Sequence, residues 1–178
     1  IFWFKKPSKI LNKSNPPFYK WFEDGITNSC YNAVDLHIDR GKGEKIALIY
    51  DSPITGNKAK LTYNQLKEKV SKFAGALDNQ GIKKGDRVII YMPMIPESVI
   101  AMLACGRIGA IHSVVFGGFA SNELASRIDD SKAKILITAS CGFEPGRTVE
   151  YRPLVDGALK LAKHKVEKVI FFQRKGHE

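Results

Sequence analysis

Apolar residues follow two alternating patterns along most of this chain. Short runs rich in Val, Ile and Phe predict β-strands, and between them apolar residues recur three and four positions apart, which predicts helices. An alternation of strands and helices is typical of a parallel sheet with right-handed crossovers. The predicted strands span residues 87–92, 111–116, 134–139 and 166–172, and the helices that follow the first three span residues 96–107, 121–129 and 153–163.

The strand runs at 88–91 and 135–137 are continuously apolar rather than alternating. Continuous apolar strands require a sheet that is covered on both faces. The helix over 96–107 carries apolar residues on most of its faces, so we expect it to lie enclosed in the core. The sequence therefore predicts an α/β fold, a parallel sheet flanked by helices.

A further helix and a hairpin precede this alternation. Thr62 and Gln65 have the spacing of a capping box, in which each side chain satisfies a free backbone N–H. Helical spacing follows and ends at Gly81. Residues 45–51 and 60–63 predict two strands around a turn-forming stretch, which is a β-hairpin.

The N-terminal part of the chain differs in composition from the rest. Residues 1–20 combine five lysines, three prolines and several aromatic rings, which predicts an irregular basic arm. The apolar spacing over 23–38 permits a helix that ends before Gly41. We therefore expect an N-terminal arm and helix over residues 1–44 and an α/β subdomain over residues 45–178.

Composition and charge argue against several classes of protein. The 178 residues are 44% hydrophobic and 10% aromatic, as in ordinary globular proteins. No apolar run reaches the roughly 18 residues that span a membrane. The net charge of +10 is concentrated at the two ends of the chain, whereas a nucleic-acid interface needs a basic stripe on one folded face. We therefore expect neither a membrane nor a nucleic-acid partner.

Cysteine and histidine patterns favour neither a disulfide nor a metal site. The three cysteines include no close pair, and the four histidines show no metal-binding spacing. We expect reduced thiols and no metal ligands. Neither a P-loop nor a G-x-G-x-x-G fingerprint occurs, and the sequence singles out no catalytic residue.

Two segments that follow predicted strands are the candidates for ligand binding. Residues 116–121 and 141–147 both lie at carboxyl ends of strands, which form the ligand crevice of an open parallel sheet. The pair Gly117-Gly118 serves either a tight turn, with Ser121 as helix N-cap, or the close approach of a ligand to the backbone.

The second segment lies in a predicted loop of about a dozen residues, which is longer than most such connections. Arg147 suits a phosphate better than a lysine would, because its planar fork can bond two oxygens. From position alone, ligand contact and a solvated surface turn stay equally open for this site. Its four candidate residues are Glu144, Pro145, Gly146 and Arg147.

Longer runs resemble a known family. YMPMIPE at 91–97 and ACGRIGAIHSVVFGGF at 104–119 strongly resemble the short-chain acyl-CoA synthetases, the acetyl- and propionyl-CoA synthetases of the adenylate-forming superfamily. Residues 30–35, 49–53 and 144–151 look more like the propionyl-CoA branch. The resemblance covers essentially the whole chain and implies part of the large N-terminal domain of such an enzyme.

The resemblance implies an activity with ATP and coenzyme A as substrates. The family joins a short carboxylic acid to ATP, with Mg²⁺ expected, and then transfers the acyl group to the thiol of coenzyme A. In the family, the tetrapeptide equivalent to Glu144-Pro145-Gly146-Arg147 contacts the nucleotide end of coenzyme A. The turn equivalent to Phe116-Gly117-Gly118 would lie beside the same ligand. The expected partners are therefore small-molecule substrates.

Three parts of the family pattern have no counterpart in this sequence. They are the Ser/Thr/Gly-rich loop that ends in lysine, the acidic nucleotide-binding motif, and the small C-terminal domain with the catalytic lysine. We therefore expect an N-terminal segment that holds part of the coenzyme A site, is inactive alone, and has the missing remainder of its own chain as a partner. The branch implies a mitochondrial matrix location in a eukaryote and the cytoplasm in a bacterium. The alternatives are a stand-alone, non-catalytic coenzyme A or nucleotide-binding module and a basic interaction protein.

Overall fold

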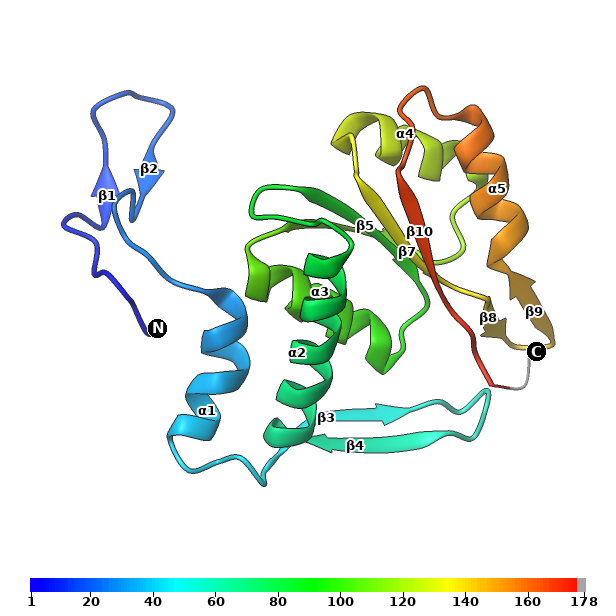
Figure 1. Ribbon diagram of the computed structural model, residues 1–178, viewed down its shortest axis with the longest axis horizontal. Helices are drawn as coiled ribbons and strands as arrows, with labels where there is room; N and C mark the ends of the chain where they lie inside the picture. The colour runs from blue at the N-terminus through cyan, green and yellow to red at the C-terminus, as the bar shows by residue number, and fades with distance from the viewer. Residues whose placement is uncertain (176–178) are drawn as a thin grey trace.

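Residues 1–175, the part described by the computed structural model, are built around a four-stranded parallel sheet with strand order β10-β7-β5-β6 (Figure 1). The predicted α/β fold with a parallel sheet is confirmed, and each strand lies within two residues of its predicted bounds. The strands are β5 (Arg87–Met92), β6 (Ile111–Phe116), β7 (Ile135–Ala139) and β10 (Lys168–Phe172), and the helices around them are α2 (Tyr63–Asn79), α3 (Pro96–Ile108), α4 (Ser121–Ser131) and α5 (Tyr151–Leu161).

Side chains of the central strand β5 alternate between two hydrophobic clusters. Val88, Ile90 and Met92 pack in the cluster formed with α2 and α3, whereas Ile89 and Tyr91 pack in the cluster formed with α4 and α5. All five are at most 5% exposed, and full burial of a side chain of this size stabilises the fold by about 2 kcal/mol. The prediction that both faces of the sheet are covered is confirmed for β5 and β7.

The two outer strands are not covered in this way. Ile111, Val114 and Phe116 of β6 are 57%, 51% and 66% exposed, and Phe171 and Phe172 of β10 are also partly exposed. Cover of these strands is therefore only partial within residues 1–175, because Val115, Val169 and Ile170 pack in the two clusters while the residues above do not. Helix α3 packs against α2, β5 and β6, and none of its residues is exposed, which agrees with its expected place in the core.

Helix α2 and the preceding hairpin form as predicted. The Thr62 hydroxyl accepts the Gln65 N–H at 3.2 Å, and the Gln65 side-chain oxygen accepts the Thr62 N–H at 2.9 Å, which completes the capping box. Strands β3 (Ile46–Asp51) and β4 (Lys58–Thr62) pair antiparallel. Figure 1 shows this hairpin running below the parallel sheet.

The N-terminal arm is more ordered than the sequence predicts. Strands β1 (Leu11–Asn12) and β2 (Lys20–Trp21) pair antiparallel and stand off from the sheet in Figure 1. The helix expected from residue 23 is shorter, because Ile26 instead bridges Lys5. It consists of a π-helical turn η1 (Tyr31–Asp35) that continues into α1 (Leu36–Asp39). The division of the chain at residue 44 stays a prediction.

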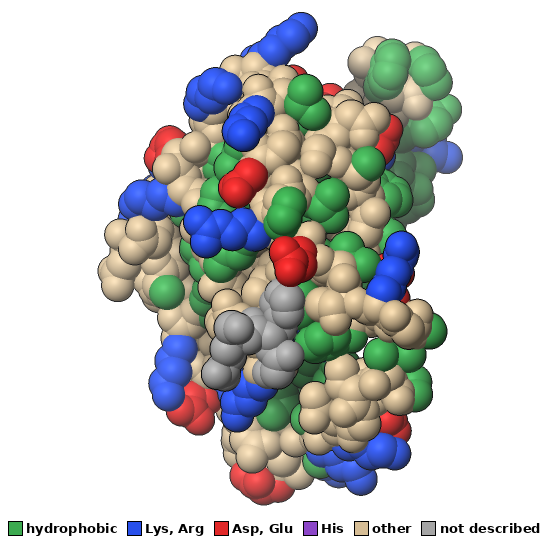
Figure 2. Space-filling view, turned by 90° about the vertical axis from the view of Figure 1, so that its right-hand side faces the viewer, with side chains coloured by type: hydrophobic (Ala, Val, Ile, Leu, Met, Phe, Trp, Pro, Cys, Tyr) green, Lys and Arg blue, Asp and Glu red, His purple; other side chains and the backbone are tan. Residues whose placement is uncertain are grey.

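Two features of residues 1–175 concern the membrane and nucleic-acid partners that the sequence argued against. Within residues 1–175, no helix combines the length and apolar character needed to cross a lipid bilayer. On the face shown in Figure 2, lysine and arginine side chains are scattered among acidic and apolar ones. That face therefore presents no continuous basic stripe.

A buried ion pair connects the N-terminal helix to the helices that cover the sheet. Asp35 is 6% exposed, and its carboxylate accepts hydrogen bonds from Arg107 Nη2 at 2.6 Å and Nη1 at 3.3 Å. The Lys67 ammonium lies 3.2 Å from the same carboxylate. Because Lys67 belongs to α2 and Arg107 to α3, one carboxylate fixes three helices relative to one another.

We expect Asp35→Ala to destabilise the protein by about 2 kcal/mol, less than for a fully buried pair, because it leaves the Arg107 guanidinium, whose side chain is 25% exposed, without its counter-charge. Asp51→Ala is the control, since Asp51 is 54% exposed and pairs with Lys58 at 3.0 Å on the surface. Such surface pairs contribute less than about 1 kcal/mol. Urea titration of both variants measures the difference, and equal midpoints would contradict a structural role for the Asp35 pair.

Candidate functional site

The two segments singled out from the sequence meet at the carboxyl edge of the sheet. A cavity of about 380 Å³ lies there, with Phe116 and Gly117 on one side and Phe143 and Glu144 on the other. A Cβ atom built on Gly118 would lie only 4.0 Å from a Glu144 carboxylate oxygen. The structure therefore brings together two predicted segments, 116–121 and 141–147, that are separated in the chain.

The second segment is a β-hairpin rather than a loop. Strands β8 (Cys141–Glu144) and β9 (Arg147–Glu150) pair antiparallel, with the last residue of β8 opposite the first residue of β9. Pro145 and Gly146 form the two-residue turn, and Gly146 has a φ of +74°, as expected at the third position of a type II turn. The prediction of a long loop is wrong, because this Pro-Gly turn lets the flanking residues pair.

Arg147 is held by its neighbour across the turn. Its Nε and Nη2 atoms lie 2.7 and 2.6 Å from Glu144 Oε2, and the Arg147 and Glu144 side chains are 71% and 39% exposed. Exposed ion pairs contribute at most about 1 kcal/mol, so an anionic ligand can replace the carboxylate. A second hollow, of about 480 Å³, lies between this turn and Ile54 and Thr55 of the β3–β4 turn. Arg147 is thus an oriented, accessible cation beside open space.

Sequence reasoning missed a second cation at the hairpin. Arg174 is only 8% exposed; its guanidinium lies 4.4 Å from the centre of the Phe143 ring and donates to the Cys141 carbonyl at 3.3 Å. Its place directly after the last strand is the signal that locates it at the carboxyl edge. Arg174 supports β8 from inside the molecule.

Two buried tyrosines behind the cavity were also missed. The rings of Tyr91 and Tyr151 lie 5.0 Å apart and are 0% and 2% exposed. The Tyr91 hydroxyl donates to the Phe119 carbonyl at 2.7 Å. Burial raises the pKa of both phenols above the ordinary value of 10.0. They are fixed, neutral supports of the site at physiological pH.

The helix that follows the glycine turn starts differently from the prediction. Ala120, not Ser121, is the N-cap of α4, and the Ser121 hydroxyl instead donates to the Leu154 carbonyl of α5 at 2.8 Å. Helix α5 begins at Tyr151, two residues earlier than predicted, so Pro153 still lies in its first turn. The serine therefore joins the two helices that cover this face.

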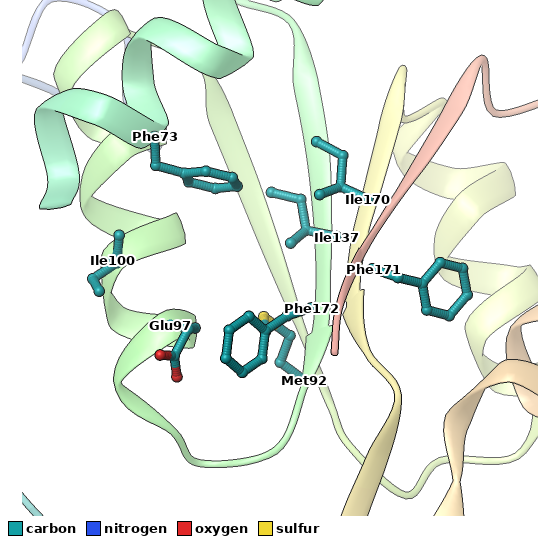
Figure 3. Close-up of a pocket in the computed structure, with 8 residues that line it drawn as sticks. All are labelled: Phe73, Met92, Glu97, Ile100, Ile137, Ile170, Phe171 and Phe172. Carbon is teal, nitrogen blue, oxygen red and sulfur yellow. The ribbon is translucent and has the colours of Figure 1, made fainter. Parts of the chain in front are cut away.

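A separate cavity of about 270 Å³ lies on the α2–α3 face (Figure 3). Phe73 of α2, Ile100 of α3 and Phe172 of β10 line it, and its lining is apolar apart from Glu97. Figure 3 shows Phe171 pointing away from this space. An apolar lining with one carboxylate does not suit a phosphate. The candidate phosphate contact is therefore Arg147, which lines the hollow between the β8–β9 and β3–β4 turns, and the cavity beside the glycine turn is the candidate space for the rest of a ligand.

Cysteine thiols and metal ligands are two types of group that can carry chemistry, both at this site and elsewhere in residues 1–175. Cys30, Cys105 and Cys141 are buried and unpaired. Burial raises the pKa of the Cys105 thiol to about 12, so it is not a thiolate. In the part of the chain that the structure describes, no three or more His, Cys, Asp and Glu side chains are grouped to hold a metal ion. The exposed, oriented Arg147 guanidinium is the group here that suits an anionic ligand.

Comparison with known proteins identifies the family. Residues 37–176 match the family model of the AMP-binding enzyme, and residues 1–33 match that of the acetyl-coenzyme A synthetase N-terminus. The chain belongs to the AMP-binding enzyme family. Its parallel sheet, its hairpin β3–β4 and the candidate site all lie within the matched residues.

Curated relatives of this AMP-binding enzyme segment have short-chain synthetase names. The mitochondrial acyl-CoA synthetase short-chain family member 3 of Homo sapiens is 57% identical over 100% of the chain, and that of Bos taurus is 58% identical over 98%. The acetyl-coenzyme A synthetase of Streptomyces coelicolor is 51% identical over 99%. The chain spans only 25–27% of the length of these relatives. The resemblance to short-chain acyl-CoA synthetases is confirmed.

We expect the protein to lose stability as the pH rises above about 10, because the buried phenols of Tyr91 and Tyr151 ionise more readily in the unfolded chain. Their raised pKa values stabilise the folded state fully below the unfolded value of 10.0, and this contribution is lost as the pH rises through the folded values. Urea midpoints at increasing pH should fall less in Tyr151→Phe than in the parent. Tyr19→Phe is the control, since Tyr19 is 50% exposed, and an equal fall in all three proteins would contradict this account.

Proposed function

We propose that the full-length protein is an AMP-forming ligase that activates a short-chain carboxylic acid, propionate or acetate, and transfers it to coenzyme A. The names of the curated relatives and the match to the AMP-binding enzyme family support this activity. The chain is 57% identical to the human mitochondrial short-chain relative and 51% identical to the Streptomyces acetyl-coenzyme A synthetase. Propionate is proposed from the resemblance of residues 30–35, 49–53 and 144–151 to the propionyl-CoA branch.

The proposed reaction has two steps. A carboxylate oxygen attacks the α-phosphorus of ATP, the bond to pyrophosphate breaks, and an acyl-adenylate forms. The coenzyme A sulfur, having lost its proton, then attacks the acyl carbon, and AMP leaves as the thioester forms. We assign this segment to the binding of coenzyme A in the second step.

This assignment rests on one observation: the glycine turn and the β8–β9 hairpin line the same cavity. Arg147 would exchange its contact with Glu144 for a phosphate of coenzyme A, bonding two oxygens with its planar fork. Pro145 and Gly146 would hold it there through their fixed turn. Gly117 and Gly118, which lack side chains, would let the rest of the ligand lie against the backbone.

We assign ATP to residues outside this segment. Magnesium would enter bound to the ATP phosphates, and it would screen their negative charge. Within residues 1–175 no cluster of acidic or histidine ligands is available to it, so none of these side chains is assigned to the ion. The remainder of the chain is therefore the expected source of the adenylation groups.

The expected cellular location is taken from the names and organisms of the relatives. The human and bovine relatives carry mitochondrial names, and the Streptomyces relative is bacterial. We propose a mitochondrial matrix location if the source is a eukaryote and a cytoplasmic one if it is a bacterium. Cell fractionation with a tagged full-length protein tests this.

In the full-length enzyme, we expect Arg147→Gln to raise the KM for coenzyme A about tenfold, because a charge-assisted contact to phosphate is lost. The ATP–pyrophosphate exchange measured without coenzyme A should stay unchanged. Arg152→Gln is the matched control, since Arg152 is exposed and lies 3.9 Å from Asp156. An unchanged KM in Arg147→Gln would refute the assigned site.

The purified 178-residue segment is expected to release no pyrophosphate from ATP and propionate, because it lacks the adenylation groups. It should still bind coenzyme A in a titration. Release of pyrophosphate would contradict the division of roles between this segment and the remainder of the chain. Coenzyme A binding by a naturally occurring protein of only this length would instead support the stand-alone binding module.

A further inference from the structure

The Tyr151 hydroxyl occupies a space between the two candidate binding elements. A Cβ atom built on Gly117, in the glycine turn, would collide with this hydroxyl. A Cβ atom built on Gly142, in β8, would lie 2.8 Å from it. Both glycines therefore provide the close approach that this tyrosine needs. One hydroxyl sets how far apart the turn and the hairpin lie.

A second tyrosine fixes the glycine turn to the sheet. Tyr91 comes from the central strand β5, and its hydroxyl donates to the carbonyl of Phe119, just after the glycine pair, at 2.7 Å. Its ring packs on Tyr151 at 5.0 Å with an interplanar angle of 33°. The two phenols thus form a continuous link from the rigid sheet to the turn and on to the hairpin.

The backbone of Tyr151 completes this link on the hairpin side. Its N–H donates to the Ser140 carbonyl at 3.0 Å, at the start of the hairpin, and its side chain is 2% exposed. Tyr151 also lines the cavity between the turn and the hairpin. A buried side chain that contacts both walls of a binding cavity controls the width of that cavity.

We propose that Tyr91 and Tyr151 are positioning residues that set the width of the coenzyme A cavity and place the Arg147 hairpin opposite the glycine turn. This inference rests on the proposed function. The pair acts through the turn and the hairpin, so it affects the coenzyme A step and not the adenylation step. A residue that only stabilises the fold would affect both.

The test uses the full-length enzyme with two assays, the KM for coenzyme A in thioester formation and ATP–pyrophosphate exchange with propionate. Tyr151→Phe and Tyr91→Phe each remove one hydroxyl, and each should raise the KM for coenzyme A by about fivefold with unchanged exchange. Tyr63→Phe is the matched control, because Tyr63 stacks on His37 at 4.7 Å on the other side of the sheet. Tyr63→Phe should change neither the KM for coenzyme A nor the ATP–pyrophosphate exchange.

A complementary pair of variants tests the packing directly. Gly142→Ala should raise the KM, because the new methyl group meets the Tyr151 hydroxyl. In the double variant with Tyr151→Phe, the contact with the hydroxyl at 2.8 Å is removed, while the ring carbons Cε1 and Cζ stay 3.1 and 3.2 Å from the methyl group, so the KM should fall only part of the way back toward that of the parent. Gly75→Ala is the glycine control, since a Cβ atom there meets nothing within 4 Å.

The outcomes separate the two proposals. An unchanged KM in both tyrosine variants, or a parallel loss of exchange and thioester formation, would overturn the positioning role. If Arg147→Gln raises the KM in the same assay while the tyrosine variants do not, only the positioning role fails. If Arg147→Gln also leaves the KM unchanged, the proposed coenzyme A site itself fails. If one tyrosine variant does not fold, the other tyrosine variant and the Gly142→Ala variants still test the positioning role.

Discussion

The structure depends on the burial of β5 and β7 on both of their faces. Because successive side chains of a strand point to opposite faces, Val88 and Ile90 face one helix pair while Ile89 and Leu136 face the other. Helices must therefore cover both faces, and the helical crossovers keep the strands parallel. As a result, all carboxyl ends lie at one edge of the sheet, where the glycine turn and the hairpin emerge.

The candidate site is built on this rigid base rather than on free loops. Tyr91 extends from the central strand to the glycine turn, and Arg174 follows the last strand and packs on the hairpin. The hairpin itself is closed by a turn of fixed geometry, and its exposed arginine is oriented by Glu144. Supports of this kind hold a binding group in place more accurately than a flexible loop does.

The outer strands of the sheet carry apolar side chains that residues 1–175 leave exposed to solvent. Val114 and Phe116 of β6 are more than half exposed, and such apolar edge strands are unfavourable in water. The chain spans about a quarter of the length of its curated relatives. Both observations support the expectation that the remainder of the chain packs against this sheet.

The strands at 87–92 and 111–116 and the capping box at Thr62 could be predicted from the sequence, because periodicity and capping are encoded within a few neighbouring residues. The family could be predicted because the runs at 91–97 and 104–119 are long enough to be specific. The edge strands, the pairing of the second candidate segment into a hairpin, and the positions of Tyr151 and Arg174 beside it became visible only in the folded chain. These features arise from contacts between residues that are distant in the chain. Local patterns do not record such contacts, so they appear only when the chain is folded.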